Sequence, residues 1–241
     1  MKIDILTLFP NMFTGFLNES IIKRAIEKGI IEEYRNDNGN KIIKVSNKYL
    51  PYNNNFIEKI NKKDKKIYYK NNQVDDYSFG GGAGMVLMCE PIYNAVEEIR
   101  NKDSHIIILA PRGKTYNQKK AIELKEYKHI IIICGHYEGF DERIYSLADE
   151  IISIGDYILT GGEVPAMAIT DSIVRLLPGA INKESLETES FDNDLLDYPV
   201  YTKPRVFKGM EVPEVLINGN HKLINEYREK ERIRITKEKN K

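Results

Sequence analysis

Apolar runs alternate with segments of helical spacing through the middle of the chain. His105–Ala110 (HIIILA) and His129–Cys134 (HIIIIC) each hold an unbroken apolar run of strand length, and Glu150–Ile154 predicts a third strand. Helical spacing of apolar residues predicts helices at 92–100, 117–125, 140–148 and 163–177. Strands without a polar face that alternate with helices are typical of a parallel sheet covered on both sides. We therefore predict an α/β fold for this part of the chain.

The N-terminal third is less regular. Ile3–Phe9 alternates apolar and polar residues, which predicts a first strand rather than a signal peptide. Phe16–Lys28 has apolar residues at helical spacing, and Gly29 can end that helix. Residues 34–73 are rich in Asn and Lys, so we expect an insertion there with little core of its own.

The C-terminal part of the pattern predicts a second, smaller domain. Residues 181–196 contain few large apolar side chains and are typical of an interdomain linker. Val212–Arg232 then predicts a short helical tail. The expected organisation is a main domain at 1–180, which carries the 34–73 insertion, and a small α-helical C-terminal domain at 197–241.

The composition excludes several classes of protein. The chain has 241 residues, of which 41% are hydrophobic and 30% charged, as expected for a globular protein. No apolar run approaches the roughly 20 residues that span a bilayer, so we expect no membrane association. Cys89 and Cys134 are the only cysteines, too few for a cysteine metal cluster or a disulfide framework, and a cytoplasmic protein is expected.

The net charge is zero, but the charges are unevenly distributed along the chain. Residues 23–70 contain 13 Lys and Arg against 6 Asp and Glu, and residues 201–241 contain 11 against 6. Residues 71–200 contain 11 against 22. Two basic ends therefore flank an acidic middle, and a phosphate-binding surface would lie at the ends. The alternative interpretation is that the Lys-rich runs are only solvated faces.

Glycine occurs where three of the predicted strands end. The segments are APRGK (110–114), CGHYEGFDER (134–143) and SIGDYILTGGE (153–163). The carboxyl ends of parallel strands meet at one edge of a sheet, and glycine lets the backbone approach a ligand closely. One such segment is an ordinary turn more often than a site, but three in succession predict a composite pocket.

Two common nucleotide-binding motifs are absent. The first strand runs into Phe9-Pro10-Asn11 and not into a glycine-rich turn, which argues against an ordinary dinucleotide-binding domain. The chain also has no GxxxxGK[ST] motif, which argues against a P-loop nucleotidase.

Four segments resemble motifs of the tRNA (guanine-N1)-methyltransferase family, in the family's order and across nearly the whole chain. They are VDDYSFGGGAGM (74–85), CGHYEGFDER (134–143), SIGDYILTGGE with the following VPAM (153–167), and GMEVPEVLINGNH (209–221). The resemblance implies the SPOUT fold with a deep trefoil knot. It also implies a homodimer with active sites at the subunit interface. The implied reaction methylates the guanosine immediately 3′ of the anticodon, position 37 of tRNA, with S-adenosylmethionine as donor and Mg2+ as a further requirement.

The resemblance also implies which residues hold the cofactor. On the matching positions, these are Leu109, Pro111, Gly135, Glu138, Ile154, Gly155, Asp156, Tyr157, Ile158, Leu159, Gly161, Gly162 and Pro165. Tyr157 is equally well explained as a core tyrosine.

Guanine N1 carries a proton, so its methylation needs a base, and charge that develops on O6 needs a cation or donor. By resemblance, Glu189 takes the position of the catalytic base, where the family has Asp, and Arg175 takes that of the catalytic Arg. The alternatives are that Glu187 or another carboxylate acts while Glu189 is a solvated charge, and that Arg175 only pairs with Asp171 four residues earlier.

Contacts with RNA are expected from the linker and the C-terminal domain, which is shortened relative to the family. We assign them to Ser190, His221, Lys222 and Arg228; Mg2+ ligands remain unassigned. The basic insertion at 34–73 is a second candidate surface for phosphate. Two other functions stay open at this point: the same fold with another RNA target, and a non-catalytic RNA-binding protein.

Overall fold

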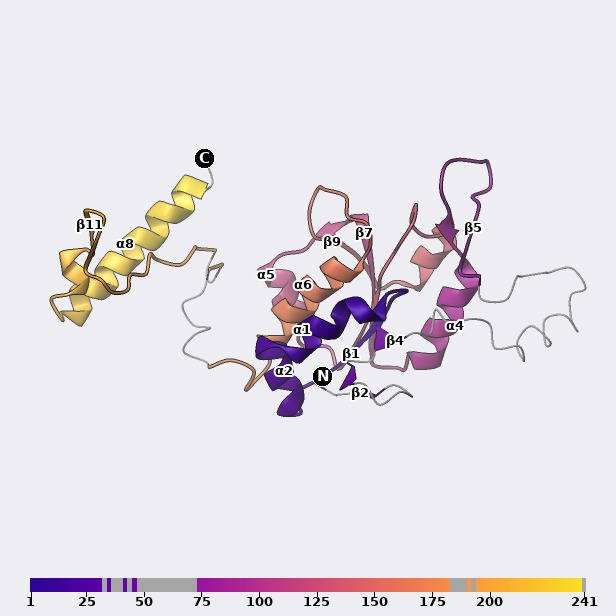
Figure 1. The fold of residues 1–241 in the computed structure, drawn as a ribbon, viewed down its shortest axis with the longest axis horizontal. Helices are drawn as coiled ribbons and strands as arrows, with labels where there is room; N and C mark the ends of the chain where they lie inside the picture. The colour runs from indigo at the N-terminus through magenta and orange to yellow at the C-terminus, as the bar shows by residue number, and fades with distance from the viewer. Residues whose placement is uncertain are drawn as a thin grey trace, which may run out of the picture. The chain divides into compact units, whose positions relative to one another are not determined.

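The computed structural model describes residues 1–31, 34–35, 41–42, 45–46, 73–182, 190–191 and 194–239. The chain divides into two compact units, Met1–Ile181 and Asn182–Lys241 (Figure 1). Most of the predicted insertion at 34–73 and part of the predicted linker at 181–196, including Glu189, lie outside the described residues.

A five-stranded parallel sheet forms the centre of the first unit. Its strand order is β4-β1-β8-β7-β9. The strands are β1 (Lys2–Leu6), β4 (Val45–Ser46), β7 (Ser104–Thr115), β8 (His129–Ile133) and β9 (Glu150–Ser153). Every pairing in this sheet is parallel, which confirms the predicted α/β class with a mainly parallel sheet. β4 falls within 34–73, so part of that segment adds an edge strand, which its polar composition did not indicate.

Helices cover both faces of the sheet, because alternate residues of each strand point to opposite sides. In β8, Ile130 and Ile132 belong to one buried cluster, and Ile131 and Ile133 belong to the other. On the first face lie η1 (Pro10–Phe13), α1 (Thr14–Asn18), α2 (Ser20–Glu27), α5 (Gln118–Leu124) and α6 (Glu163–Val174) (Figure 1). The second face is covered by α4 (Cys89–Ile99) and η2 (Glu142–Leu147).

Two predicted helices differ from the observed ones. The helix expected at 16–28 is divided between α1 and α2, because Glu19 is extended and Ser20 has a φ of +52°. The segment expected as a helix at 140–148 is the 3-10 helix η2, which Asp141 begins by accepting a hydrogen bond from the Arg143 N–H. Short helical segments often adopt this tighter winding.

β7 is longer than predicted, and it pairs with β9 twice. Leu109 and Lys114 are both registered against Ile152, and the intervening residues shift the register. Gly113 lies directly against β9: a Cβ there would be 2.6 Å from the carbonyl carbon of Ile151 and from the backbone N of Ile152. Only a residue without a side chain fits at this crossing.

Short hairpins lie outside the main sheet. β2 (Tyr34–Arg35) pairs with β3 (Lys41–Ile42), and β5 (Asp75–Asp76) pairs with β6 (Val86–Leu87). The β5–β6 loop carries GGGAG, in which all four glycines have positive φ. Phe79, at the start of this loop, is fully exposed.

The second unit contains one long helix and a hairpin. Its elements are β10 (Val206–Phe207), β11 (Met210–Glu211), η3 (Glu214–Leu216) and α8 (His221–Lys239). The extended segment before the hairpin lies along α8, since the Leu196 N–H donates to Thr236 Oγ1 and the Arg232 Nε donates to the Leu196 carbonyl. No helix in the described part of the chain is long and apolar enough to cross a bilayer.

Candidate functional site: a pocket at the strand ends

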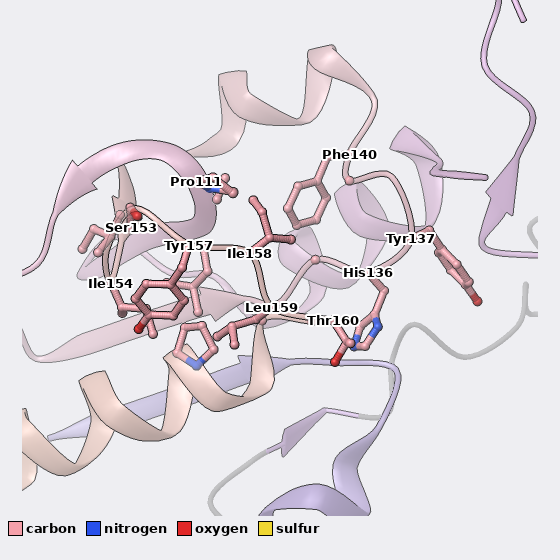
Figure 2. A pocket seen from close by; sticks show the side chains of 18 of the residues that line it. Pro111, His136, Tyr137, Phe140, Ser153, Ile154, Tyr157, Ile158, Leu159 and Thr160 are labelled. Atoms are coloured by element: carbon pink, nitrogen blue, oxygen red, sulfur yellow. The ribbon is translucent and has the colours of Figure 1, made fainter. Parts of the chain in front are cut away.

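A cavity of about 330 Å³ lies at the ends of β8 and β9 and beside residues 109–111, where the pairing of β7 with β9 shifts register. Its walls come from residues within three segments, 109–111, 135–140 and 152–162, together with Tyr145 of η2 and the start of α6 (Figure 2). These walls belong to the three glycine-bearing segments that follow the predicted strands, and the first of them lies within the observed strand β7. The edge formed by the carboxyl ends of parallel strands is where open α/β sheets bind ligands.

Nearly all the residues predicted to hold a cofactor line this cavity. They are Leu109, Pro111, Gly135, Glu138, Ile154, Gly155, Tyr157, Ile158, Leu159, Gly161, Gly162 and Pro165. Asp156 does not line it and is exposed. Tyr157 is 54% exposed, so the interpretation of this residue as a core tyrosine is wrong.

The cavity has further lining residues that the sequence analysis did not identify. They are Ala110, His136, Tyr137, Gly139, Phe140, Tyr145, Ile152, Ser153 and Thr160. Most adjoin a predicted residue, so their position in the same motifs was the available signal. Tyr145 comes from η2, and no feature of the sequence connected it with the pocket.

Glycine is required at the pocket by close packing. A Cβ on Gly162 would lie 2.6 Å from the Cα of Cys134, and the Gly162 N–H donates to the Gly135 carbonyl at 2.9 Å. A Cβ on Gly135 would lie 2.8 Å from the ring of Phe140. These glycines hold the loop after β8 against the start of α6, which an ordinary turn would not need.

The pocket wall is mainly apolar and aromatic. Ile158 lies between Pro111 and Phe140, while Tyr137 points away from the other labelled side chains (Figure 2). Beside the pocket, the Arg112 guanidinium stacks 3.4 Å over the Tyr145 ring and donates two hydrogen bonds to Glu142. Burial raises the pKa of the Tyr145 phenol, which therefore stays neutral at physiological pH.

A buried carboxylate links the pocket to the end of β1. Glu163, in the first turn of α6, is 1% exposed and accepts hydrogen bonds on both carboxylate oxygens. His136 Nε2 lies 2.7 Å from Glu163 Oε2, and Thr7 Oγ1 donates to Glu163 Oε1. Phe9 packs edge-on against His136 with ring centroids 4.6 Å apart.

Of the two predicted catalytic residues, the structure describes only Arg175, which does not line the pocket. Glu189 lies outside the described residues. Arg175 is the half-buried C-cap of α6, whereas Pro165, which lines the pocket, is in the first turn of that helix. The rise of an α-helix puts these two residues roughly 15 Å apart along its axis.

The residues predicted to bind RNA lie in the second unit. His221 and Lys222 are exposed at the start of α8. Ser190 accepts a hydrogen bond from the Asp197 N–H through its hydroxyl. Arg228 is half-buried and stacks 4.6 Å over the Tyr198 ring, so part of its binding capacity is used within this unit.

No group of three or more His, Cys, Asp or Glu side chains in the described ranges is arranged to hold a metal ion. Glu138 is the carboxylate on the pocket wall, and it lies beside the GGGAG loop. Its N–H donates to the Met85 carbonyl at 3.0 Å, and a Cβ on Gly84 would lie 2.7 Å from its side chain. The loop therefore borders the pocket through Glu138.

Comparison with known proteins finds one matching family model and relatives that share one name. Residues 1–41 and 51–241 match the family model described as tRNA (guanine-1)-methyltransferase TrmD. A Staphylococcus epidermidis protein named tRNA (guanine-N(1)-)-methyltransferase is 50% identical over 242 residues, which covers 99% of this chain and 89% of that protein. Proteins of the same name from Malacoplasma penetrans and Clostridioides difficile are 50% and 48% identical, covering 98% and 99% of this chain and 94% and 95% of their own length.

Proposed function

The chain belongs to the tRNA (guanine-N1)-methyltransferase family and is an enzyme of that class, and from this premise we propose that it methylates N1 of the guanosine at position 37 of tRNA, with S-adenosylmethionine as donor. The observation that carries the proposal is the cavity at the ends of β8 and β9 and beside the middle of β7, lined by twelve of the residues expected to hold that cofactor. The names of the relatives favour guanine N1 over another RNA target.

The chemistry of the cavity suits this cofactor. Apolar and aromatic walls such as Ile154, Tyr157 and Leu159 fit an adenine ring, and the backbone groups of the glycine segments fit ribose hydroxyls and polar adenine atoms. S-adenosylmethionine supplies an electrophilic methyl group on its sulfonium. The binding site alone is tested by calorimetry with S-adenosylhomocysteine, and the reaction by methyl transfer to tRNA transcripts with guanosine or adenosine at position 37. Equal transfer to both transcripts would contradict the proposed target.

We assign removal of the N1 proton to Glu189. A carboxylate can accept this proton as the methyl group is transferred. Glu189 has a longer side chain than the Asp of the family, but it carries the same carboxylate. Glu189→Gln should reduce turnover at least a hundredfold, the usual scale of general-base catalysis, with unchanged cofactor affinity. Glu187→Gln is the matched control and should retain activity. Turnover that survives in Glu189→Gln and is lost in Glu187→Gln would move the assignment to Glu187.

We propose that Arg175 acts on the pocket of a partner subunit in a homodimer. Within one chain it lies at the far end of α6 from the pocket, and its permanent charge suits a guanine O6 on which charge develops. Apolar side chains around the pocket support a covered surface, since Ile158 is 79% exposed and Val164 51%.

A mixing experiment tests this arrangement. Refolded mixtures of Arg175→Ala chains with Gly162→Val chains, which have a blocked pocket, would regain about a quarter of the wild-type activity if sites are shared between subunits. No recovery, or a monomer in sedimentation, would contradict it.

Three further expectations belong to this proposal. The double pairing of β7 with β9 and the close crossing at Gly113 support a knotted chain path of the SPOUT type. We expect Mg2+ from the family, with ligands that include groups beyond the described residues, and we derive no step through it. A tRNA substrate and two cysteines, Cys89 and Cys134, that form no disulfide fit a cytoplasmic enzyme.

A further inference from the structure

Thr7, Glu163 and His136 form a chain of hydrogen bonds that the proposed reaction does not use. They come from the end of β1, the start of α6 and the loop after β8. Thr7 and Glu163 are separated by 156 positions in the sequence, yet their side chains are in direct contact. The three residues are called the Thr7–Glu163–His136 relay below.

The relay is buried, so its carboxylate depends on the hydrogen bonds that it accepts. The Glu163 side chain is 1% exposed and that of His136 is 13% exposed. A buried carboxylate is costly unless both oxygens accept hydrogen bonds, and here Thr7 and His136 supply one each. The carboxylate accepts, so His136 Nε2 carries a proton and the ring orientation is fixed.

The surrounding backbone is shaped around the relay. A Cβ on Gly161 would lie 2.3 Å from His136 Cε1, 2.4 Å from His136 Nε2 and 2.5 Å from Glu163 Oε2. The loop before α6 therefore passes directly over the His136–Glu163 hydrogen bond. Phe9 packs edge-on against the His136 ring. The imidazole is thus in contact with the segments that follow β1 and β9.

His136 also lines the cavity. Its Nε2 is used by Glu163, and its Nδ1 has no hydrogen-bond partner within the described part of the chain. Nδ1 is therefore the polar atom of this ring that remains for a ligand. Because the buried Glu163 carboxylate fixes the His136 ring through Nε2, Nδ1 is presented in one orientation. This lowers the entropic cost of binding a ligand there.

We infer that Glu163 and Thr7 are positioning residues that act through His136: the relay fixes the 135–140 and 155–162 loops and the His136 ring in the arrangement that binds the methyl donor. The inference rests on the proposed function, since it takes the occupant of the cavity to be S-adenosylmethionine. It predicts that weakening the relay lowers cofactor affinity more than it lowers the rate of the bound complex.

Thr7→Val tests the relay with little change of shape, because valine replaces the hydroxyl with a methyl group. It removes the hydrogen bond to Glu163 and the acceptor of the Phe9 N–H. We expect the Kd for S-adenosylhomocysteine and the KM for S-adenosylmethionine to rise about tenfold, or about 1.4 kcal/mol. The kcat at saturating cofactor should change less than about twofold. Thr7→Ser keeps the hydroxyl and should restore most of the affinity.

Thr170→Val is the matched control. Thr170 lies in α6, as Glu163 does, and its hydroxyl is buried with no hydrogen-bond partner in the described residues. This variant should keep the wild-type Kd. Thr7→Val should also have no further effect in a His136→Ala background, because the relay acts through the His136 ring.

Each alternative result has a defined meaning. A wild-type Kd for Thr7→Val overturns the inference. So does a lower melting temperature and lower kcat with an unchanged KM, which is the pattern of a merely structural role. Additive losses in the Thr7→Val, His136→Ala double variant overturn it as well. If the wild-type protein does not bind S-adenosylhomocysteine, the proposed function fails, and this inference fails with it.

Discussion

Replacing Gly113 by alanine tests the close crossing of β7 over β9. The added Cβ would lie 2.6 Å from the carbonyl carbon of Ile151 and from the N and carbonyl carbon of Ile152. These are backbone atoms within a strand, so they cannot turn aside as a side chain can. The φ of Gly113 lies outside the left-handed region, so alanine adds no backbone strain of its own. The whole effect is therefore steric.

The expected loss of stability follows from this contact with backbone atoms. Overpacking a well-packed site usually costs about 1–3 kcal/mol, and a contact with backbone alone puts Gly113→Ala at about 3 kcal/mol. In a domain of the size of the unit Met1–Ile181, each kcal/mol corresponds to roughly 2–4 °C in Tm. Thermal unfolding followed by circular dichroism should therefore show a decrease of about 6–12 °C.

Gly15→Ala is the control for this experiment. Gly15 lies in α1, has no positive φ, and a Cβ there meets nothing within 4 Å. Alanine favours a helix over glycine, so the Tm should stay the same or rise. If Gly113→Ala melted within about 2 °C of the wild type, the two strands would not cross as closely as described, and the steric argument for the crossing would be wrong.

Two further predictions concern titratable groups. Burial opposes the ionisation of Glu150, but hydrogen bonds from Lys120 and His105 outweigh it and lower the pKa of the carboxyl. The ionised Glu150 side chain therefore stabilises the folded protein at pH values above the pKa of this carboxyl in the unfolded chain. That stabilisation is lost as the pH falls through the pKa of the carboxyl in the folded protein. Urea denaturation should therefore show Glu150→Gln to be about 1–2 kcal/mol less stable at pH 7, with a difference that shrinks below about pH 4; a constant difference would contradict this. Burial raises the pKa of the Cys89 thiol to about 11. Its alkylation at pH 8 should be slow and speed up about tenfold per pH unit, and fast alkylation at pH 8 would contradict the raised pKa.

The central sheet could be predicted because its signal is local. The isoleucine runs of β7 and β8 are apolar on both faces. An unbroken apolar run of this length is sufficient to predict a strand that is buried on both faces. The polar continuation of β7 to Thr115 could not be predicted this way, because APRGKT has no strand pattern. It becomes a strand only because β9 lies beside it. Backbone pairing with a distant segment decided this part of the fold.

The residues of the pocket also differ in whether the local sequence could predict them. Gly135 and Gly162 stand in recognisable motifs, and their close contact follows once both strand ends meet at one edge. Tyr145 reaches the pocket from η2, and Glu163 reaches Thr7 across 156 positions, so neither contact has a local signal. Asp156 shows the opposite error. It lies within a predicted motif, but it is exposed in the irregular loop after Gly155 and does not line the cavity.

The parallel pairing of β1 with β8 has a consequence for protein synthesis. Asp4 and His129 are hydrogen-bonded across these strands but are separated by 125 positions. At usual rates of elongation, roughly 6–25 s pass between the appearance of β1 and that of its partner. During that interval one edge of an apolar strand is open to other chains, which is a hazard for aggregation. The yield of folded enzyme in the cell should therefore depend on how quickly the ribosome delivers β8.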